Sequence, residues 1–152
     1  MVQHQALYRY NIAMRDYFKH YKFLGDYLLR EVFAGELRQA LKAYKDYTIV
    51  PVPVSSETLL DRGFNQVTGL LEGAGIFYQD CLSKEEAAKQ SHLTRQERLA
   101  LKNHYSLATE QALPERVLLV DDVYTTGATI VSIALLFHEK GVKDVKTFSL
   151  AR

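Results

Sequence analysis

From residue 48 onward, hydrophobic positions along the chain form short unbroken runs that alternate with segments of helical spacing. The short runs at 48–54, 116–120 and 144–150 are rich in β-branched residues, which is typical of buried strands. The segments 64–71 and 128–140 carry apolar residues three or four positions apart, which predicts helices packed by one face. Strands that alternate with helices favour an α/β fold with a parallel sheet flanked by helices.

The first 46 residues carry only helical patterns. Asn11 has the side chain of a helix cap, and Gly25 interrupts the pattern before Asp26, which is suited to begin a second helix. Apolar residues on the two expected helix faces are Met14, Phe18, Tyr21, Leu29, Val32, Phe33, Leu37, Ala40 and Leu41. The sequence thus predicts one domain over residues 1–152, with a helical N-terminal part (1–46) before a sheet core (47–152).

Between the first two predicted strands of the core, the signals are weaker. Asp61 is expected to cap a helix that stops near Gly73, with Arg62 in its first turn, and residues 76–81 are expected to form a short strand. Residues 83–90 have no apolar period, which favours a mobile loop. The pattern from Thr94 to Glu97 matches a capping box and predicts a helix start just after that loop.

The segment from Val117 to Thr129 is the most specific part of the sequence. Its apolar run is followed directly by the adjacent carboxylates of Asp121 and Asp122. A hydroxyl-rich turn comes next, in which Gly127 can take a positive φ. Because a helix is expected to begin there, its first N–H groups favour an anion such as phosphate. The alternative is an ordinary strand–loop–helix connection in which Asp and Thr act only as caps. Neither a Walker loop nor a dinucleotide-binding glycine fingerprint occurs.

This segment resembles the signature of phosphoribosyltransferases, in which two acids and a Thr-Thr-Gly-x-Thr turn hold the ribose and phosphate of phosphoribosyl pyrophosphate. The resemblance implies catalytic roles for Asp121 and Asp122. It also implies a magnesium ion carried by the ligand and contacted by the same two acids. The implied ribose-phosphate site consists of Asp121, Asp122, Thr125, Thr126, Gly127, Ala128 and Thr129; the pyrophosphate loop of Val54, Ser55, Ser56 and Arg62; and the mobile loop of Gln90, Ser91, Arg95 and Arg98.

Over nearly its whole length the chain is similar to the ComF competence family. The matching blocks are Tyr10-Asn11, Lys22-Phe-Leu-Gly-Asp26, Pro51-Val-Pro53, Arg62-Gly-Phe-Asn-Gln66, Gln90-Ser-His-Leu93, Arg95, Arg98 and Leu150-Ala-Arg152. Two departures stand out. Members usually begin with a four-cysteine zinc ribbon, whereas Cys81 alone makes no zinc site; the ribbon is lost or the chain starts after it. Thr58 stands where an arginine is common, which implies weaker pyrophosphate binding.

Composition narrows the class of protein. A hydrophobic fraction of 47%, one cysteine and no signal-like N-terminus favour a globular cytoplasmic protein without membrane insertion. A net charge of +1 argues against strong non-specific binding of nucleic acid. The N-terminal part nevertheless interleaves basic residues with tyrosines, which suits a single DNA strand, although an amphipathic helix pair with solvated lysines explains the same pattern.

The sequence therefore predicts a phosphoribosyltransferase-like protein that binds phosphoribosyl pyrophosphate or a related ribose phosphate with magnesium. The family resemblance implies a role in natural competence and DNA uptake, with an unassigned acceptor if the domain is catalytic. The alternative is a non-enzymatic module with a regulatory ribose-phosphate pocket, which binds single-stranded DNA or another competence protein.

Overall fold

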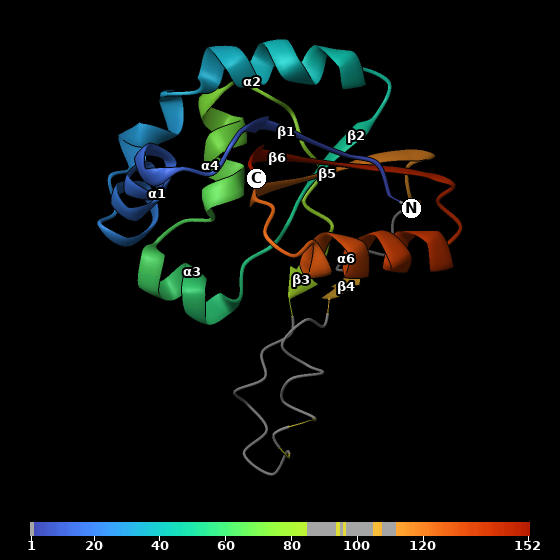
Figure 1. Cartoon of the computed structure of the whole chain (residues 1–152). Helices are drawn as coiled ribbons and strands as arrows, with labels where there is room; N and C mark the ends of the chain where they lie inside the picture. The colour runs from blue at the N-terminus through green and yellow to red at the C-terminus, as the bar shows by residue number, and fades with distance from the viewer. Residues whose placement is uncertain (1, 85–93, 95, 97–104, 108–111) are drawn as a thin grey trace.

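The computed structural model describes residues 2–84, 94, 96, 105–107 and 112–152. Within this part of the chain, the main sheet has four parallel strands in the order β1-β6-β5-β2. The strands are β1 (His4–Tyr8), β2 (Thr48–Pro51), β5 (Arg116–Val123) and β6 (Asp144–Ala151). The structure confirms the predicted parallel sheet flanked by helices (Figure 1).

Helices cover both faces of this sheet (Figure 1). On one face, α6 (Ala128–Glu139) packs against Val117 and Leu119 of β5. On the other face, α1 (Ile12–Phe18), α2 (Ala34–Leu41) and α4 (Gln66–Gly73) pack against Leu118 and Val120. Successive strand residues point to opposite faces, which explains why this unbroken apolar run is buried on both sides.

The prediction of a purely helical N-terminal part is wrong at its start. Residues His4–Tyr8 form β1, which lies at the sheet edge in parallel register with Thr147–Ala151 of β6. No apolar alternation marks this segment, because an edge strand gains its hydrogen bonds from the neighbouring strand rather than from a buried pattern. The strand brings Tyr10, just beyond its end, beside the C-terminal Arg152, and the Tyr10 N–H donates to the Arg152 carbonyl at 2.8 Å.

The helices after β1 follow the predicted faces but divide differently. Asn11 caps α1 as expected, because its Oδ1 accepts from the Met14 N–H at 2.9 Å. A single π-helical turn, η1 (Lys19–Phe23), continues α1 up to the break at Gly25. Beyond Asp26, whose side chain makes no cap bond, the chain forms the 3₁₀ turn η2 (Tyr27–Glu31), then α2 and the 3₁₀ turn η3 (Lys42–Tyr44). The single second helix is thus split into three parts.

The predicted helix start at Asp61 is wrong. Asp61 lies inside α3 (Ser56–Arg62), which is capped by Ser55 and ends where Gly63 takes a φ of 84°. A second helix, α4, then begins with Asn65 as its cap and ends at Gly73, as expected for that end. Arg62 therefore lies in the last turn of α3, and not in a first turn. The left-handed glycine explains the break, since the helix cannot continue through a positive φ.

Residues 76–81, all of which the structure describes, do not form the predicted strand, although the Gln79 N–H donates to the Ile49 carbonyl at 2.9 Å. A strand begins directly after this segment instead: β3 (Leu82–Lys84) pairs antiparallel with β4 (Tyr105–Leu107). The remaining residues of the predicted mobile loop, including Gln90, Ser91, Arg95 and Arg98, lie outside the described residues, as does Glu97 of the predicted capping box. In the described part of the chain, no helix combines the length and apolarity needed to cross a membrane.

Candidate functional site

The turn between β5 and α6 forms a small cavity at the carboxyl end of the sheet. Gly127 takes a φ of 78° and caps α6, and the Ala128 N–H donates to the Thr126 Oγ1 at 3.3 Å. A cavity of about 40 Å³ is lined by Asp121, Val123, Tyr124, Thr125, Thr126, Gly127, Ala128, Thr129 and Ile130. The first N–H groups of a helix have no partner in the preceding turn, so this cavity offers donors to an anion.

Tyr124 lies directly against Gly127 and fixes the shape of the turn. A Cβ atom on Gly127 would lie 2.2 Å from the Tyr124 hydroxyl oxygen, which is far inside van der Waals contact. The Tyr124 ring stacks on His4 with 4.0 Å between centroids, and the Arg152 guanidinium lies 5.1 Å from the ring centroid. The strand β1 and the C-terminal residue therefore hold the tyrosine that supports the turn. Sequence reasoning assigned no role to His4 or Tyr124.

His4 is held by two hydroxyls of β6. Its Nδ1 lies 2.8 Å from the Thr147 Oγ1, and its Nε2 lies 3.0 Å from the Ser149 Oγ. Burial, with a smaller contribution from the Arg152 charge, lowers the pKa of His4 from 6.5 to about 4. His4 is therefore neutral at pH 7, as its packing beneath Tyr124 requires.

The low pKa of His4 predicts a pH dependence of stability. The unfolded chain binds a proton near pH 6.5 and the folded chain only near pH 4, so His4 contributes its full stabilisation above 6.5 and loses it as the pH falls towards 4. The free energy of unfolding, measured in urea at several pH values between 4 and 7, should change less with pH for His4→Gln than for the parent chain. The same dependence on pH for His4→Gln and for the parent chain would contradict the assignment.

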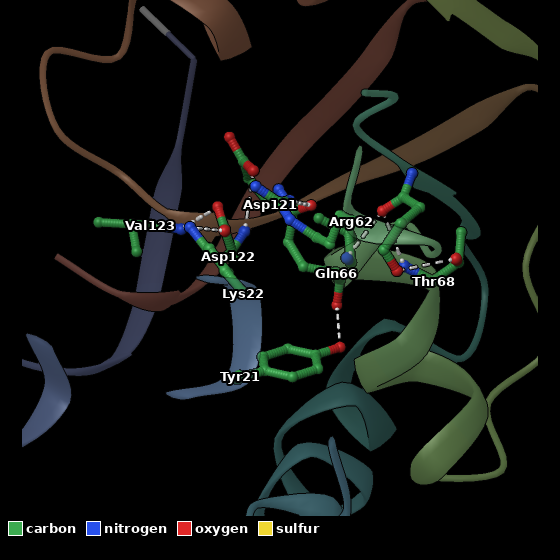
Figure 2. Close-up of polar contacts among 10 residues, drawn as sticks. Tyr21, Lys22, Arg62, Gln66, Thr68, Asp121, Asp122 and Val123 are labelled. Atoms are coloured by element: carbon green, nitrogen blue, oxygen red, sulfur yellow. Dashed lines mark hydrogen bonds and ion pairs between the residues drawn. The ribbon is translucent and has the colours of Figure 1, made fainter. Parts of the chain in front are cut away.

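The two adjacent acids occupy different surroundings (Figure 2). The strand β5 runs on through both of them, so alternation places Asp121 on the α6 face and Asp122 on the face of the N-terminal helices. Asp121 lines the turn cavity, and its Oδ1 accepts from the Asp122 N–H at 2.8 Å. Asp122 is 7% exposed; its Oδ1 accepts from the Val123 N–H at 2.7 Å, and its Oδ2 forms an ion pair with Lys22.

The surroundings separate the pKa values of the two carboxyls. Burial raises the pKa of Asp121 well above its usual range, and the neighbouring Asp122 carboxylate raises it further. For Asp122, burial acts in the same direction and is the largest single influence, but the Lys22 ammonium together with the contacts to Asp121 and the Val123 N–H holds the pKa below its usual value. Asp122 is thus an ionised, internally paired group, while Asp121 is the acid that faces the cavity.

The predicted pyrophosphate loop follows β2. Val54 and Ser55 are partly buried, and Ser56 is exposed at the start of α3. The Ser55 Oγ accepts the helix-cap hydrogen bond from the Thr58 N–H at 3.1 Å. Arg62 donates to the Gln66 side chain (Figure 2). Its guanidinium also lies over the Phe23 ring, 5.8 Å from the centroid. A cavity of about 490 Å³ is lined by Lys22, Phe23, Leu24, Gly25, Thr58, Asp61 and Arg62.

A second groove shares lining residues with this cavity and with the turn between β5 and α6. It has a volume of about 580 Å³ and is lined by Tyr10, Arg15, Asp16, Phe18, Lys19, Lys22, Phe23, Val123 and Thr125. Val123 and Thr125 also line the turn cavity, and Lys22 and Phe23 also line the cavity at Arg62. The groove therefore presents aromatic rings and mostly basic side chains beside the turn.

A magnesium ion carried by the ligand fits these residues in part. Magnesium in phosphate sites is held by one or two carboxylates together with phosphate oxygens. Asp121 presents an oxygen to the cavity, together with the turn hydroxyls, and is suited to contact such an ion. Asp122 already has a cation, because the Lys22 ammonium is paired with its Oδ2.

Residues 28–152, which include the two acids and the turn, match the family described as the phosphoribosyl transferase domain. Competence protein ComFC of Streptococcus pneumoniae is 49% identical over 151 residues, covering 99% of this chain and 69% of the relative. Competence protein ComFC of Bacillus subtilis is 32% identical over 154 residues, covering 99% of this chain and 64% of the relative. The chain belongs to the ComFC family of competence proteins.

Among solved structures, a hypoxanthine phosphoribosyltransferase from Staphylococcus aureus aligns with 80% of this chain and 61% of its own. Its sequence identity is 16% and the TM-score is 0.42. The chain spans about two thirds of the length of the two ComFC relatives.

Proposed function

We propose that this protein binds phosphoribosyl pyrophosphate, or a related ribose phosphate, at the turn between β5 and α6, and that this binding serves natural competence. The observation that carries the proposal is the cavity in which Asp121 faces the hydroxyls and N–H groups of a turn built on a left-handed glycine. A backbone cradle of this kind suits a terminal phosphate, and a carboxylate beside it suits ribose hydroxyls.

If the domain is catalytic, its own residues contribute position and charge. The turn holds the phosphate end of the sugar, and Asp121 lies where positive charge develops at the anomeric carbon during displacement of pyrophosphate. A ligand-borne magnesium ion would neutralise the pyrophosphate, and Arg62 in α3 is suited to bind the same diphosphate in fork geometry. Release of pyrophosphate in the presence of an acceptor would separate an enzyme from a binding module.

The test is calorimetric titration with phosphoribosyl pyrophosphate and magnesium. We expect saturable binding that Asp121→Asn weakens by about tenfold, since one hydrogen-bonded charge contributes on the order of 1.4 kcal/mol. With inorganic phosphate alone the same variant should bind equally well or better, because the removed carboxylate repels the anion. Asp46→Asn, an exposed acid just before β2, is the matched control. Absence of binding to the parent chain would refute the proposal.

The second candidate function is binding of single-stranded DNA along the groove beside the turn. The specific observation is that Tyr10, Phe18 and Phe23 line this groove together with Arg15, Lys19 and Lys22. The exposed rings of Tyr10 and Phe23 offer stacking surfaces to bases, and the cations offer contacts to phosphates, without base-edge readout. The two candidates are compatible, because the groove meets the turn cavity at Val123 and Thr125.

A further inference from the structure

Lys22 reaches the acid pair from a part of the chain that precedes the segment matching the phosphoribosyl transferase domain. The match to that domain begins at residue 28, whereas Lys22 lies in the π-helical turn η1. π-turns are rare and often occur at functional sites. The Lys22 side chain is 16% exposed and its ammonium also lies over the Phe18 ring, 4.7 Å from the centroid. The N-terminal segment thus directs one cation towards the site (Figure 2).

The ion pair changes the charge that a ligand meets. Asp121 and Asp122 together would place two negative charges beside the phosphate turn, and carboxylates repel phosphate in a poorly solvated site. A carboxylate as buried as Asp122 is also costly without a partner. The Lys22 ammonium forms an ion pair with the Asp122 Oδ2 and so compensates one of the two charges. It also lines both larger cavities, so it lies between the turn and the Arg62 side of the site.

We propose that Lys22 is an internal counter-ion of Asp122 that allows the turn to hold a ribose monophosphate without a divalent cation. This inference rests on the proposed function, and it names the ligand class as ribose 5-phosphates, including the 5′-phosphate end of a nucleotide. Magnesium then matters for the pyrophosphate group and much less for the ribose phosphate itself. Lys22 is a positioning residue, since it acts on the ligand through Asp122.

The experiment measures the dissociation constant of ribose 5-phosphate in EDTA and in magnesium. For the parent chain we expect similar values in both. Lys22→Met should weaken binding in EDTA by about tenfold, because a charge of like sign is uncovered near the phosphate, and magnesium should restore most of the loss. The double variant Lys22→Met with Asp122→Asn removes both charges and should bind in EDTA like the parent.

The variants also separate the two possible failures. If the parent chain binds no ribose 5-phosphate in either condition, the inference is wrong; the proposed function fails as well only if phosphoribosyl pyrophosphate with magnesium does not bind either. If the parent binds and Lys22→Met binds equally well in EDTA, the inference alone is wrong. Thermal unfolding of each variant reports whether it folds. If Lys22→Met alone is unfolded, the double variant is the decisive comparison. Weak binding of ribose 5-phosphate in EDTA by the folded double variant overturns the inference.

Discussion

Replacement of Gly127 by Val is expected to lower the affinity for phosphoribosyl pyrophosphate by about 100-fold, equivalent to roughly 2.7 kcal/mol. Two physical effects combine. The added Cβ would lie 2.2 Å from the Tyr124 hydroxyl oxygen, and a β-branched residue resists the observed φ of 78°. The turn would have to rearrange, and with it the donors at the start of α6. Calorimetry with the magnesium complex measures the loss.

Gly141 provides the matched control at the other end of α6. It has a φ of 93° but open space around its Cα, so Gly141→Val carries the backbone strain without the collision and without contact to the site. It should lower the free energy of unfolding and leave the affinity unchanged. Adding Tyr124→Ala to Gly127→Val removes the colliding ring, and partial recovery would assign that part of the loss to the clash. Unchanged affinity in Gly127→Val would show that the turn geometry is not required.

The segment from β5 to α6 could be predicted from the sequence because its signals are local. An unbroken β-branched run, two acids, one glycine at a turn and an apolar helical period all fall within a few neighbouring residues, and each determines its own backbone conformation. The structure confirms the strand, the positive φ of Gly127 and the helix that ends before Gly141. Asn11 was predictable for the same reason, since a cap bond joins residues three apart.

Where several residues offered the same local chemistry, the sequence was ambiguous. Ser55, Asp61 and Asn65 are all good helix caps, and the structure uses Ser55 and Asn65 while Asp61 lies inside α3. The choice depends on where Gly63 breaks the helix and on how α4 packs against the core. Such packing decisions are non-local, and propensity alone does not make them.

The contacts that complete the site join distant parts of the sequence. β1 exists because the edge of β6 pairs with it, and Lys22 meets Asp122 because the N-terminal helices cover that face of the sheet. Strand alternation would have indicated that adjacent acids on a continuous strand face opposite ways. It was missed because the apolar run ends at Val120, which suggested that the strand ended there too.

Binding of single-stranded DNA, if it follows the groove beside the turn, is expected to fall steeply with salt. Each neutralised phosphate contributes roughly −0.7 to the log–log slope, so removal of two cations by Arg15→Gln with Lys19→Gln should make the slope shallower by about 1.4. Both residues line the groove with Tyr10 and Phe18. Fluorescence anisotropy with a labelled oligothymidine, measured over a range of salt concentrations, gives the slope.

The control pair is Lys42→Gln with Lys45→Gln, which removes the same charge from a cavity beside Thr48 and Ile49 of β2. The two double variants have the same net charge. The salt dependence of their DNA affinity should therefore differ only if the DNA strand follows the groove. Phosphoribosyl pyrophosphate should also compete with the oligonucleotide where the groove meets the turn. Equal slopes for the two pairs would indicate attraction by bulk charge alone. An interaction insensitive to salt would contradict direct binding of the strand along this groove.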